Sequence, residues 1–483
     1  MKSAIAGSLF FDLIIVGGGS GNSIISRDLS HLSIALIDDG EHFGGTCLNA
    51  GCIPTKMFVH VADIAADALH AESLGLQVPT TNADWPSIRD RIFTRTDGLS
   101  DAELQNRDLK IANLTVFRET FGFEHTHQLV SASGVRIHAE RIVIAAGSRP
   151  RRLAAAGARG AGIYDSDSIM RIDELPGSLL IVGGGAVAVE FAHVFSALGV
   201  QVTQVVRGAS LLSGSSFDAE LAKAFTARAS TQWKVVTGAV VESVDRDPDL
   251  IVALDTGERI TTDAVLVAIG RTPNTDTLAL AGVGVDLHPD GRLAVDSRQR
   301  VLAGGEPIDG LFGLGDVSSP WQLKHVANHQ ARVVQHNLLN PTDLIGGDPG
   351  PVPAAIFSRP QVAWFGVTGQ DAPDDAVVVT RLYGTTAWGW ALEDTTSFCK
   401  LIVDTTTGRL LGAHIVGAEA SILIQPLVLA ASLGLSVRGL ARSMYWPHPA
   451  ATEVIENALL DAEKQLRADE IALAEPTKVS TKA

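Results

Sequence analysis

The segment that decides the fold is Leu13–Asn22, with the sequence LIIVGGGSGN, in which four apolar residues run directly into a glycine cluster. The apolar residues predict a buried strand over Asp12–Val16, preceded by a short tail. A second apolar run, Ser33–Ile37, ends in Asp38. With a helix-like stretch between them, these features are typical of the βαβ unit that binds a dinucleotide. The glycines allow backbone N–H groups to approach a pyrophosphate at a helix N-terminus.

The same pattern occurs a second time in Leu179–Ala188, with the sequence LLIVGGGAVA, and its second strand, Val200–Val206, ends in Arg207. One such turn alone is a weak indication, because it can be a tight structural turn, but two in matching contexts predict two dinucleotide sites. Asp38 is placed to accept the ribose hydroxyls of an adenosine. Arg207 is placed to pair with a 2′-phosphate, which favours NADPH at the second site. The alternative for Arg207 is a solvated surface charge.

Length and composition limit the class of protein. The chain has 483 residues, enough for about three domains, and contains 47 glycines, 46% hydrophobic residues and 5% aromatic residues. This composition excludes a disordered, collagenous or coiled-coil chain and favours a glycine-rich α/β enzyme. The net charge of −16 argues against nucleic acid or an anionic membrane as a partner. With no cleavage pattern after the N-terminal apolar stretch and no membrane-length apolar run, we expect a soluble, cytoplasmic protein.

The sequence changes character after about residue 345, where short alternating runs predict an α+β domain without a nucleotide motif. Helix-like stretches follow from Gln425 and from Ala451, and beyond Ala468 the polar composition predicts a frayed tail. The predicted strands are Val352–Phe357, Gln361–Val367, Ala376–Tyr383, Phe398–Asp404 and Leu410–Val416.

Two of the three cysteines, Cys47 and Cys52, lie close together in GGTCLNAGCIPTK, residues 44–56. In a chain without a secreted disulfide framework, such a pair is redox-active or metal-binding more often than structural. A zinc site would need two further ligands, and Cys399 stands alone in a β run, so we expect no metal. Redox chemistry is the favoured interpretation, with buried packing as the alternative. Cys399 is most simply a small apolar core residue.

The cysteine phrase, with a glycine-rich turn on either side of it, resembles the flavoprotein disulfide reductases. The resemblance covers nearly the whole chain and includes IAAGSRP at 144–150, AIGRTPN at 268–274, LFGLGD at 311–316 and HPAATE at 448–453. It implies an α/β fold of two Rossmann-like dinucleotide-binding domains and a C-terminal α+β dimerisation domain. The implied division is an FAD-binding domain in two parts, 1–150 and 273–345, an NAD(P)H-binding domain, 151–272, an interface domain, 346–467, and a tail, 468–483.

The resemblance also assigns roles to residues. Cys52 matches the thiol nearest the flavin, whose thiolate makes a charge-transfer contact, and Cys47 matches the interchange thiol that attacks the substrate. Both need their thiolate form, which a helix N-terminus would favour. Lys56 and Glu190 match an ion pair near the flavin, with one residue from each nucleotide-binding domain.

His448 and Glu453 match a pair that the family contributes from the partner subunit, in which the carboxylate orients an imidazole that moves protons to and from the thiols. The active enzyme is therefore expected to be a homodimer. The alternative for the His-Pro segment is a capped loop. The implied cofactors are FAD and NADPH, with NADH possible. The matching cofactor-binding positions are Gly17, Gly19, Ser20, Gly21, Asp38, Gly45, Thr46, Lys56, Ala146, Gly147, Gly183, Gly185, Ala188, Arg207, Gly270, Arg271, Gly315 and Asp316.

Within the family, three segments look most like the mycothione reductases: GNS at 21–23, QLKHVAN at 322–328 and YWPHP at 445–449. The run YGTTAWGWALED at 383–394 adds to this likeness, which implies NADPH-dependent reduction of a small-molecule disulfide, mycothiol disulfide, in thiol redox balance. Three positions differ from common family patterns. Asn22 stands where the FAD-binding turn usually has a third glycine, and Ala186 stands where many relatives have an aromatic residue over the nicotinamide site. Ser213 stands where glutathione reductase has a second phosphate-binding arginine. Dihydrolipoamide dehydrogenase and glutathione reductase-like enzymes are the alternatives, and a non-catalytic FAD-binding subunit is an alternative from another class.

Overall fold

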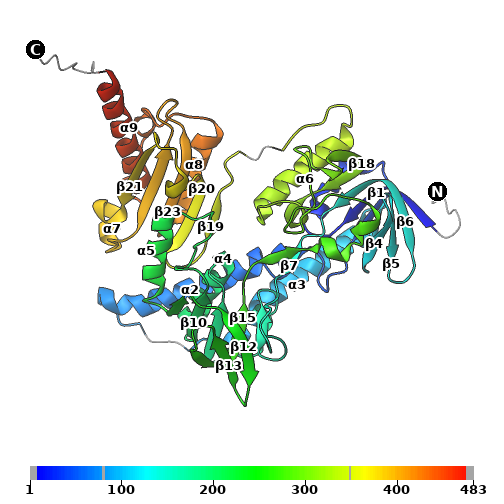
Figure 1. The fold of residues 1–483 in the computed structure, drawn as a ribbon, viewed down its shortest axis with the longest axis horizontal. Coiled ribbons are helices and arrows are strands. Elements are labelled where there is room, and N and C mark those ends of the chain that lie inside the picture. The colour runs from blue at the N-terminus through cyan, green and yellow to red at the C-terminus, as the bar shows by residue number, and fades with distance from the viewer. Residues whose placement is uncertain (1–7, 79–81, 348–349, 475–483) are drawn as a thin grey trace, which may run out of the picture.

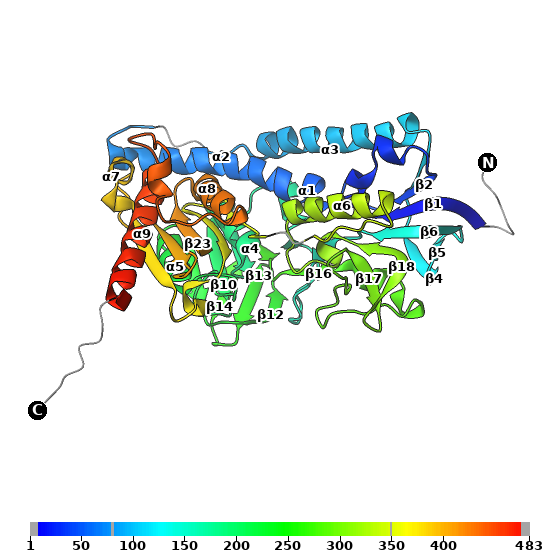
Figure 2. The same ribbon diagram turned by 90° about the horizontal axis from the view of Figure 1, so that it is seen from above.

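The chain was analysed as a computed structural model, which describes residues 8–78, 82–347 and 350–474. Figures 1 and 2 show three packed units: the N-terminal sheet, the second sheet below it in Figure 1, and the C-terminal unit at the other end of the molecule. No helix in the described part of the chain is long and apolar enough to cross a membrane.

The first sheet has eight strands, with the parallel order β18-β6-β1-β2-β3 at its centre. β18 pairs with β6, so the chain returns to this sheet after it has built the second one. The residues Leu13–Val16 are buried, as expected for a strand covered on both faces. The strands are β1 (Ser8–Val16), β2 (Ile34–Ile37), β3 (Leu114–Phe117), β4 (Phe121–His125), β5 (Gln128–Ser131), β6 (Arg136–Ile144), β17 (Arg300–Ala303) and β18 (Glu306–Gly313).

The second sheet has the parallel order β11-β10-β9-β15-β8 and carries the second glycine-rich turn. A separate antiparallel sheet, β12-β13-β14, lies beside it, and the short pair β7 and β16 connects the two nucleotide-type units. The strands are β7 (Ser148–Pro150), β8 (Ile163–Asp165), β9 (Ser178–Val182), β10 (Gln201–Val206), β11 (Lys234–Thr237), β12 (Val241–Arg246), β13 (Leu250–Leu254), β14 (Arg259–Thr262), β15 (Ala264–Val267) and β16 (Arg271–Pro273).

Four helices support these sheets and a fifth begins at the cysteine segment. An aromatic core joins three of these helices, which carry Phe58, Trp85 and Phe195. Phe58 stacks on Trp85 with ring centroids 5.0 Å apart, and the ring centroids of Trp85 and Phe195 are 5.8 Å apart. The Trp85 indole N–H donates to the carbonyl of Ile172, so this large core residue leaves no polar atom unpaired. The helices are α2 (Cys52–Ala71), α3 (Trp85–Lys110), α4 (Ala186–Ala197), α5 (Ala219–Ala229) and α6 (Lys324–Leu339).

The C-terminal unit is an antiparallel sheet of order β19-β20-β23-β22-β21, with helices packed on it (Figure 1). Its strands confirm the predicted α+β pattern, with bounds within two residues of those expected. They are β19 (Ala354–Ile356), β20 (Gln361–Gly366), β21 (Val377–Leu382), β22 (Phe398–Val403) and β23 (Leu410–Gly417), and the helices are α7 (Ala387–Ala391), α8 (Ala420–Ser432) and α9 (Glu453–Ala474).

Two local predictions are wrong. After the first glycine turn the chain forms short 3₁₀ turns, Gly21–Ile24 and Arg27–Leu29, instead of a helix. The segment 20–33 holds five serines and two adjacent isoleucines, residues that compete with or disfavour helical backbone. The frayed tail is also wrong as far as Ala474, where α9 ends. Alanine, glutamate and leucine dominate its last turns, and these residues favour helix. The rest of the predicted tail, residues 475–483, lies outside the described residues.

Candidate active site

The first glycine turn sits at the carboxyl edge of the first sheet. Gly17 donates its N–H to the carbonyl of Ile37 at 2.8 Å, which places it beside Asp38. Its φ is +111°, and a Cβ there would lie 2.2 Å from the carbonyl oxygen of Ala145, so only glycine fits. A Cβ on Gly21 would lie 2.8 Å from the Cβ of Ala145. The protein's own packing therefore requires these two predicted glycines.

Asp38 ends β2 next to this turn and is 8% exposed. Its carboxylate accepts from the backbone N–H groups of Gly40 and Gly44, at 3.0 and 3.1 Å. Burial raises the pKa of Asp38, against the lowering effect of these two N–H donors. A Cβ on Gly18 would lie 2.1 Å from its Oδ2, so the carboxylate faces the glycine turn, as an acceptor for an adenosine ribose should.

The second glycine turn repeats this geometry at the carboxyl edge of the second sheet. Gly183 donates to the carbonyl of Val205 at 2.9 Å, and a Cβ on it would lie 2.2 Å from the carbonyl oxygen of Ala268. Gly185 precedes α4, which has no side-chain cap, and a Cβ there would meet nothing within 4 Å. Ala188 is buried in the first turn of this helix. An uncapped helix N-terminus facing open space fits a dinucleotide phosphate.

Arg207 follows β10 at the same edge and is exposed. Strand β10 pairs with β9, and Val182, the last residue of β9, lies opposite Val205 of β10. Arg207 therefore lies one strand away from Gly183, as Asp38 does from Gly17. Both the proposed cofactor role and the solvated-charge alternative fit this position.

The cysteine segment lies against the first glycine turn. A Cβ on Gly45 would lie 2.6 Å from the Cα of Gly19, so the two backbones touch. Thr46 begins the short helix α1 (Thr46–Asn49), which carries Cys47. Cys52 then begins the 20-residue helix α2. The structure thus brings both predicted thiols to the nucleotide turn.

The two thiols differ in acidity. The hydrogen bond from Cys47 lowers the pKa of Cys52 to about 6, and the Lys56 ammonium acts in the same direction against desolvation. The same hydrogen bond, with burial, raises the pKa of Cys47. The opposite pKa shifts favour the thiolate on Cys52 and the proton on Cys47 in the reduced pair, so Cys47 must lose a proton before it can react as a thiolate.

Lys56 pairs with Glu190, as expected, with Nζ and Oε2 2.5 Å apart. The ammonium also lies 4.6 Å from the centroid of the Phe357 ring, and the N–H of Phe357 donates to the other Glu190 oxygen at 2.9 Å. Because Lys56 is on α2 and Glu190 on α4, the pair joins the thiol-bearing helix to the helix that follows the second glycine turn.

This arrangement predicts how the thiolate of Cys52 titrates. If Cys52 contacts a bound flavin, as the family resemblance implies, the two-electron-reduced holoenzyme should show a long-wavelength charge-transfer absorbance. We expect this absorbance above pH 6 and its loss as the pH falls through about 6, because only the thiolate of Cys52 can donate charge to the flavin. Lys56→Met should raise this midpoint, since it removes a cation, and Glu190→Gln should lower it, since it removes an anion. A pH titration of the absorbance in the three proteins checks the order. Shifts in the same direction for both variants would contradict it.

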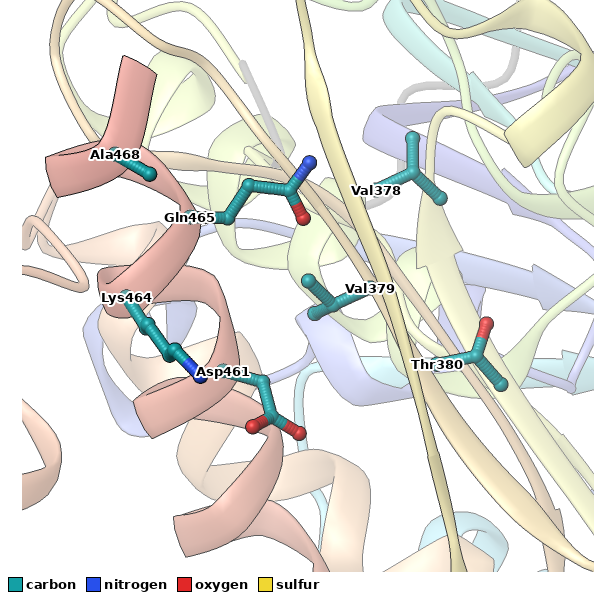
Figure 3. A pocket seen from close by; sticks show the side chains of 7 residues that line it. All are labelled: Val378, Val379, Thr380, Asp461, Lys464, Gln465 and Ala468. Atoms are coloured by element: carbon teal, nitrogen blue, oxygen red, sulfur yellow. The ribbon is translucent and has the colours of Figure 1, made fainter. Parts of the chain in front are cut away.

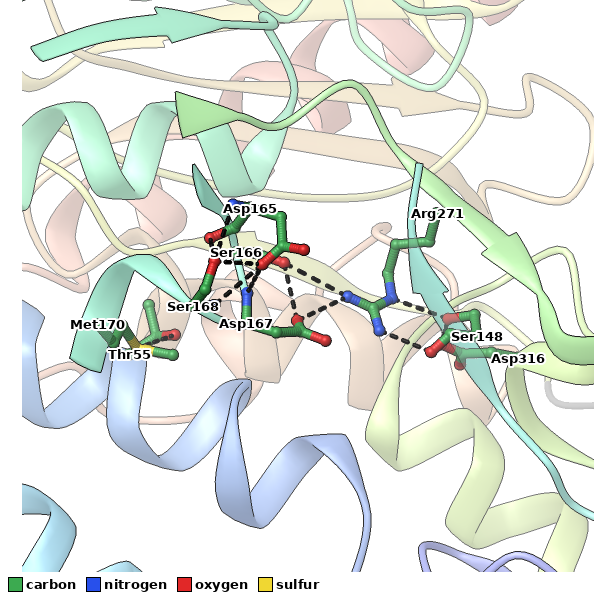
Figure 4. Close-up of polar contacts among 9 residues, drawn as sticks. All are labelled: Thr55, Ser148, Asp165, Ser166, Asp167, Ser168, Met170, Arg271 and Asp316. Atoms are coloured by element: carbon green, nitrogen blue, oxygen red, sulfur yellow. Dashed lines mark hydrogen bonds and ion pairs between the residues drawn. The ribbon is translucent and has the colours of Figure 1, made fainter. Parts of the chain in front are cut away.

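A polar network links the segments that follow β6, β15 and β18 (Figure 4). Ser148 donates its hydroxyl to Asp316 at 2.7 Å, and the Arg271 Nε donates to the same hydroxyl at 2.8 Å. Arg271 also reaches Asp167 at 3.4 Å. These contacts place the Arg271 side chain between the two sheets. Gly315, before Asp316, has a φ of +75° and donates its N–H to the side-chain carbonyl of Gln330 at 2.8 Å.

The remaining predicted positions lie in the two crossover segments. Ala146 and Gly147 follow β6, where the side chain and backbone N–H of Asn274 donate to their carbonyls at 2.9 and 3.0 Å. Gly270 follows β15 with a φ of +106°. These contacts hold the connection between the two sheets in one conformation.

His448 and Glu453 form a pair, with Nδ1 and Oε1 3.8 Å apart, and the histidine side chain is 68% exposed. They lie at the start of α9, in the C-terminal unit, whereas Cys52 starts α2 beside the first sheet. Both views show these helix starts well apart within one molecule (Figures 1 and 2). The structure does not bring this pair to the thiols of its own chain, so any shared site needs a second subunit.

Two polar contacts were missed by the sequence analysis, and one of them lies near the thiols. The ammonium of Lys324, the first residue of α6, donates to the Ser20 hydroxyl at 2.9 Å. His193, which is 1% exposed, pairs with Asp63 at 2.8 Å. Lys56 and Asp63 are seven residues apart on α2, and this spacing is the only sequence signal for a second polar contact between α2 and α4.

A surface hollow between β21 and α9 contains none of the predicted site residues (Figure 3). Its lining includes Val379, Thr380, Asp461 and Lys464. The candidate site is therefore the cysteine segment with its two glycine turns, not this hollow.

Two dinucleotide-type turns flanking a close dithiol, with a C-terminal α+β unit, define the class of flavoprotein disulfide reductases. The family model described as "Pyridine nucleotide-disulphide oxidoreductase" matches residues 11–331, and its dimerisation domain matches residues 352–459. The chain belongs to this family, whose members bind FAD and depend on NAD(P)H.

Relatives in this family cover nearly the whole chain. Mycothione reductase of Mycobacterium tuberculosis strain H37Rv is 45% identical over 465 residues, 93% of this chain and 99% of that protein. Dihydrolipoyl dehydrogenase of Chlamydia muridarum is 30% identical over 474 residues, 94% and 98% of the two chains. Among solved structures, the HOCl-induced flavoprotein disulfide reductase RclA from Escherichia coli superimposes with a TM-score of 0.81 at 26% identity, covering 93% and 99% of the chains.

Proposed function

We propose that this chain is an NADPH-dependent mycothione reductase, which reduces mycothiol disulfide to mycothiol in the cytoplasm and maintains thiol redox balance. The observation that carries the proposal is the Cys47–Cys52 pair between two dinucleotide turns, in a chain 45% identical to a mycothione reductase over 99% of that protein. The proposed division is the one expected from the sequence, with FAD on the first sheet, NADPH on the second and dimer contacts from the C-terminal unit. The proposal includes no nucleic-acid partner.

The residues around the first turn would hold FAD and those around the second would hold NADPH, and together the two cofactors would supply the electron pair that reduces the Cys47–Cys52 disulfide. The proton held on Cys47 must leave before it attacks, and His448 of the partner subunit would accept it. The Cys47 thiolate then displaces one mycothiol from the substrate, forming a mixed disulfide. His448 protonates the leaving thiolate. The Cys52 thiolate attacks the sulfur of Cys47, which restores the disulfide and releases the second mycothiol as a thiolate that takes a proton from solvent.

The homodimer is part of the proposal. The C-terminal unit matches a dimerisation-domain model, and helix α8 with its C-cap residue exposes Ile422, Leu429 and Leu433, at 65%, 60% and 65%. These residues are spaced by seven and four positions, which puts them on one face of the helix. Apolar side chains gathered on one exposed face support a contact with a second copy.

Arg207 predicts the nucleotide preference. Arg207→Ala should raise the KM for NADPH by about 10- to 100-fold, because a charge-assisted contact to the 2′-phosphate is lost, and should change the KM for NADH little. Arg228→Ala is the matched control, an exposed arginine in the last turn of α5 in the same unit. Steady-state kinetics with both nucleotides measure the effect. Equal changes for NADPH and NADH would support the solvated-charge alternative.

The experiment that tests the function is turnover of the purified protein with mycothiol disulfide, glutathione disulfide and lipoamide, each with NADPH and with NADH. The proposal predicts the highest kcat/KM with mycothiol disulfide and NADPH. Equal or faster reaction with lipoamide and the NAD couple would identify a dihydrolipoamide dehydrogenase instead. Failure of NADPH to bleach the flavin anaerobically would support a non-catalytic role.

A further inference from the structure

The carboxylate of Glu453 contacts two parts of the C-terminal unit at once. One oxygen faces His448, 3.8 Å from Nδ1, and the other accepts the backbone N–H of Ala387 at 3.1 Å. Ala387 is the first residue of the short helix α7. A single side chain therefore contacts both the histidine and this helix, so α7 begins close to His448.

Helix α7 presents an aromatic side chain that the protein does not cover. Trp390 is 68% exposed, although its indole N–H donates to the carbonyl of Gly384 at 2.9 Å. That bond pins the ring and leaves its apolar face open. The turn is built to hold this position: a Cβ on Gly389 would lie 1.8 Å from the carbonyl oxygen of Tyr383, and the hydroxyl of Thr386 caps the helix by accepting the N–H of Gly389 at 3.0 Å.

A second aromatic side chain is exposed close to His448 in the sequence. Tyr445, three residues before the histidine, has a relative exposure of 103%. The next residue, Trp446, is anchored by its indole N–H on the carbonyl of Ala441 at 2.8 Å. The chain thus turns one aromatic inward as an anchor and leaves the neighbouring one outside. Large exposed aromatics held in place beside a functional group mark a binding surface more often than chance exposure.

The chemistry of this surface selects its ligand. A pinned indole with an open face suits the C–H face of a sugar ring, which is apolar and flat, better than it suits a charged peptide. The Ala387 N–H is already paired with the Glu453 carboxylate, and the negative charge of that carboxylate disfavours an anionic ligand beside it. A disulfide whose thiols carry neutral carbohydrate fits both features.

We propose that Trp390 is a specificity-determining residue that stacks on the carbohydrate portion of the disulfide substrate, with the exposed Tyr445 as a second aromatic contact, while His448 faces the sulfur atoms. This inference rests on the proposed function and identifies side chains that would distinguish a sugar-bearing disulfide from a peptide disulfide or lipoamide. Because α7 belongs to the same subunit as His448, the partner of the reacting thiols would supply both the proton carrier and the sugar contact.

The test compares Trp390→Ala, Trp390→Phe and the unaltered holoenzyme with two substrates: mycothiol disulfide and the disulfide of N-acetylcysteine amide, which lacks the sugars and is uncharged. Trp390→Ala should lower kcat/KM for mycothiol disulfide by about 10- to 100-fold, mostly through KM, and that for the sugar-free disulfide by less than about 2-fold. Trp390→Phe should restore most of the loss. Leu109→Ala, which truncates another exposed apolar side chain far from the site, is the control and should change neither value.

The outcomes separate the two proposals. If the unaltered enzyme prefers glutathione disulfide or lipoamide, the proposed function has failed. If it prefers mycothiol disulfide but Trp390→Ala affects both disulfides equally, or neither, the function stands and the sugar contact is overturned. Loss of the dimer in Trp390→Ala, measured by light scattering, would also overturn the sugar contact, because the indole would then be an interface residue.

Discussion

Replacing Cys47 with serine is expected to lower disulfide turnover by at least about 10³-fold, because the residue that forms the mixed disulfide is lost. Reduction of bound FAD by NADPH should survive, since the glycine turns and the Lys56–Glu190 pair are untouched. Stopped-flow absorbance of the flavin and steady-state turnover, measured on the same preparation, separate the two half-reactions.

Cys399→Ala is the control for this substitution. Cys399 is 0% exposed within β22, and burial raises its pKa well above the usual thiol range, so it is inert towards disulfides. Its replacement should leave both half-reactions close to those of the unaltered enzyme. Full disulfide turnover by Cys47→Ser would remove the redox pair from the mechanism, whatever the control shows.

Replacing His448 with alanine is expected to lower kcat by about 10²- to 10³-fold, which is the usual contribution of a positioned proton carrier. The effect is large here because Cys47 holds a proton in the reduced pair: the hydrogen bond to Cys52 raises its pKa, so an acceptor must remove that proton before attack. Glu453→Gln should cost less, since glutamine still offers an acceptor to the N–H of Ala387 and keeps α7 in place.

Measurement of kcat with a saturating disulfide checks the order of these variants, His448→Ala below Glu453→Gln below the unaltered enzyme. The mass of each variant in solution, determined by light scattering, shows whether the dimer survives. A His448→Ala enzyme that remains dimeric and turns over at the original rate would leave the histidine with no part in proton transfer.

Much of the fold could be predicted because it repeats a simple pattern. The glycine turns follow apolar strands whose neighbours end at Asp38 and Arg207, and the parallel register places each charged residue beside its turn. The strands of the C-terminal unit alternate clearly enough to be located within two residues. The segment between β1 and β2 was predicted incorrectly. A dinucleotide turn normally precedes a helix, but the serines and isoleucines of this segment disfavour one, and short 3₁₀ turns form instead.

Some features of the candidate site could be predicted from the sequence, and others could not. The cysteine spacing is visible in the sequence, but the different acidities of Cys47 and Cys52 depend on one hydrogen bond and on the cation of Lys56. Contacts between helices distant in sequence leave little signal: His193 and Asp63 are 130 residues apart in the chain. The separation of His448 from the thiols of its own chain is likewise a property of the packed units.

The most direct test of the central claim, a site shared between two subunits, is activity in mixed dimers of Cys47→Ser and His448→Ala chains. Each homodimer should be nearly inactive. In the mixed dimer, one site combines both substitutions, while the other combines the intact thiols of the His448→Ala chain with the intact histidine of the Cys47→Ser chain. We therefore predict about half of the original activity per mixed dimer. Mixed dimers as inactive as the two homodimers would contradict the account, because the thiols and the histidine would then have to act within one chain.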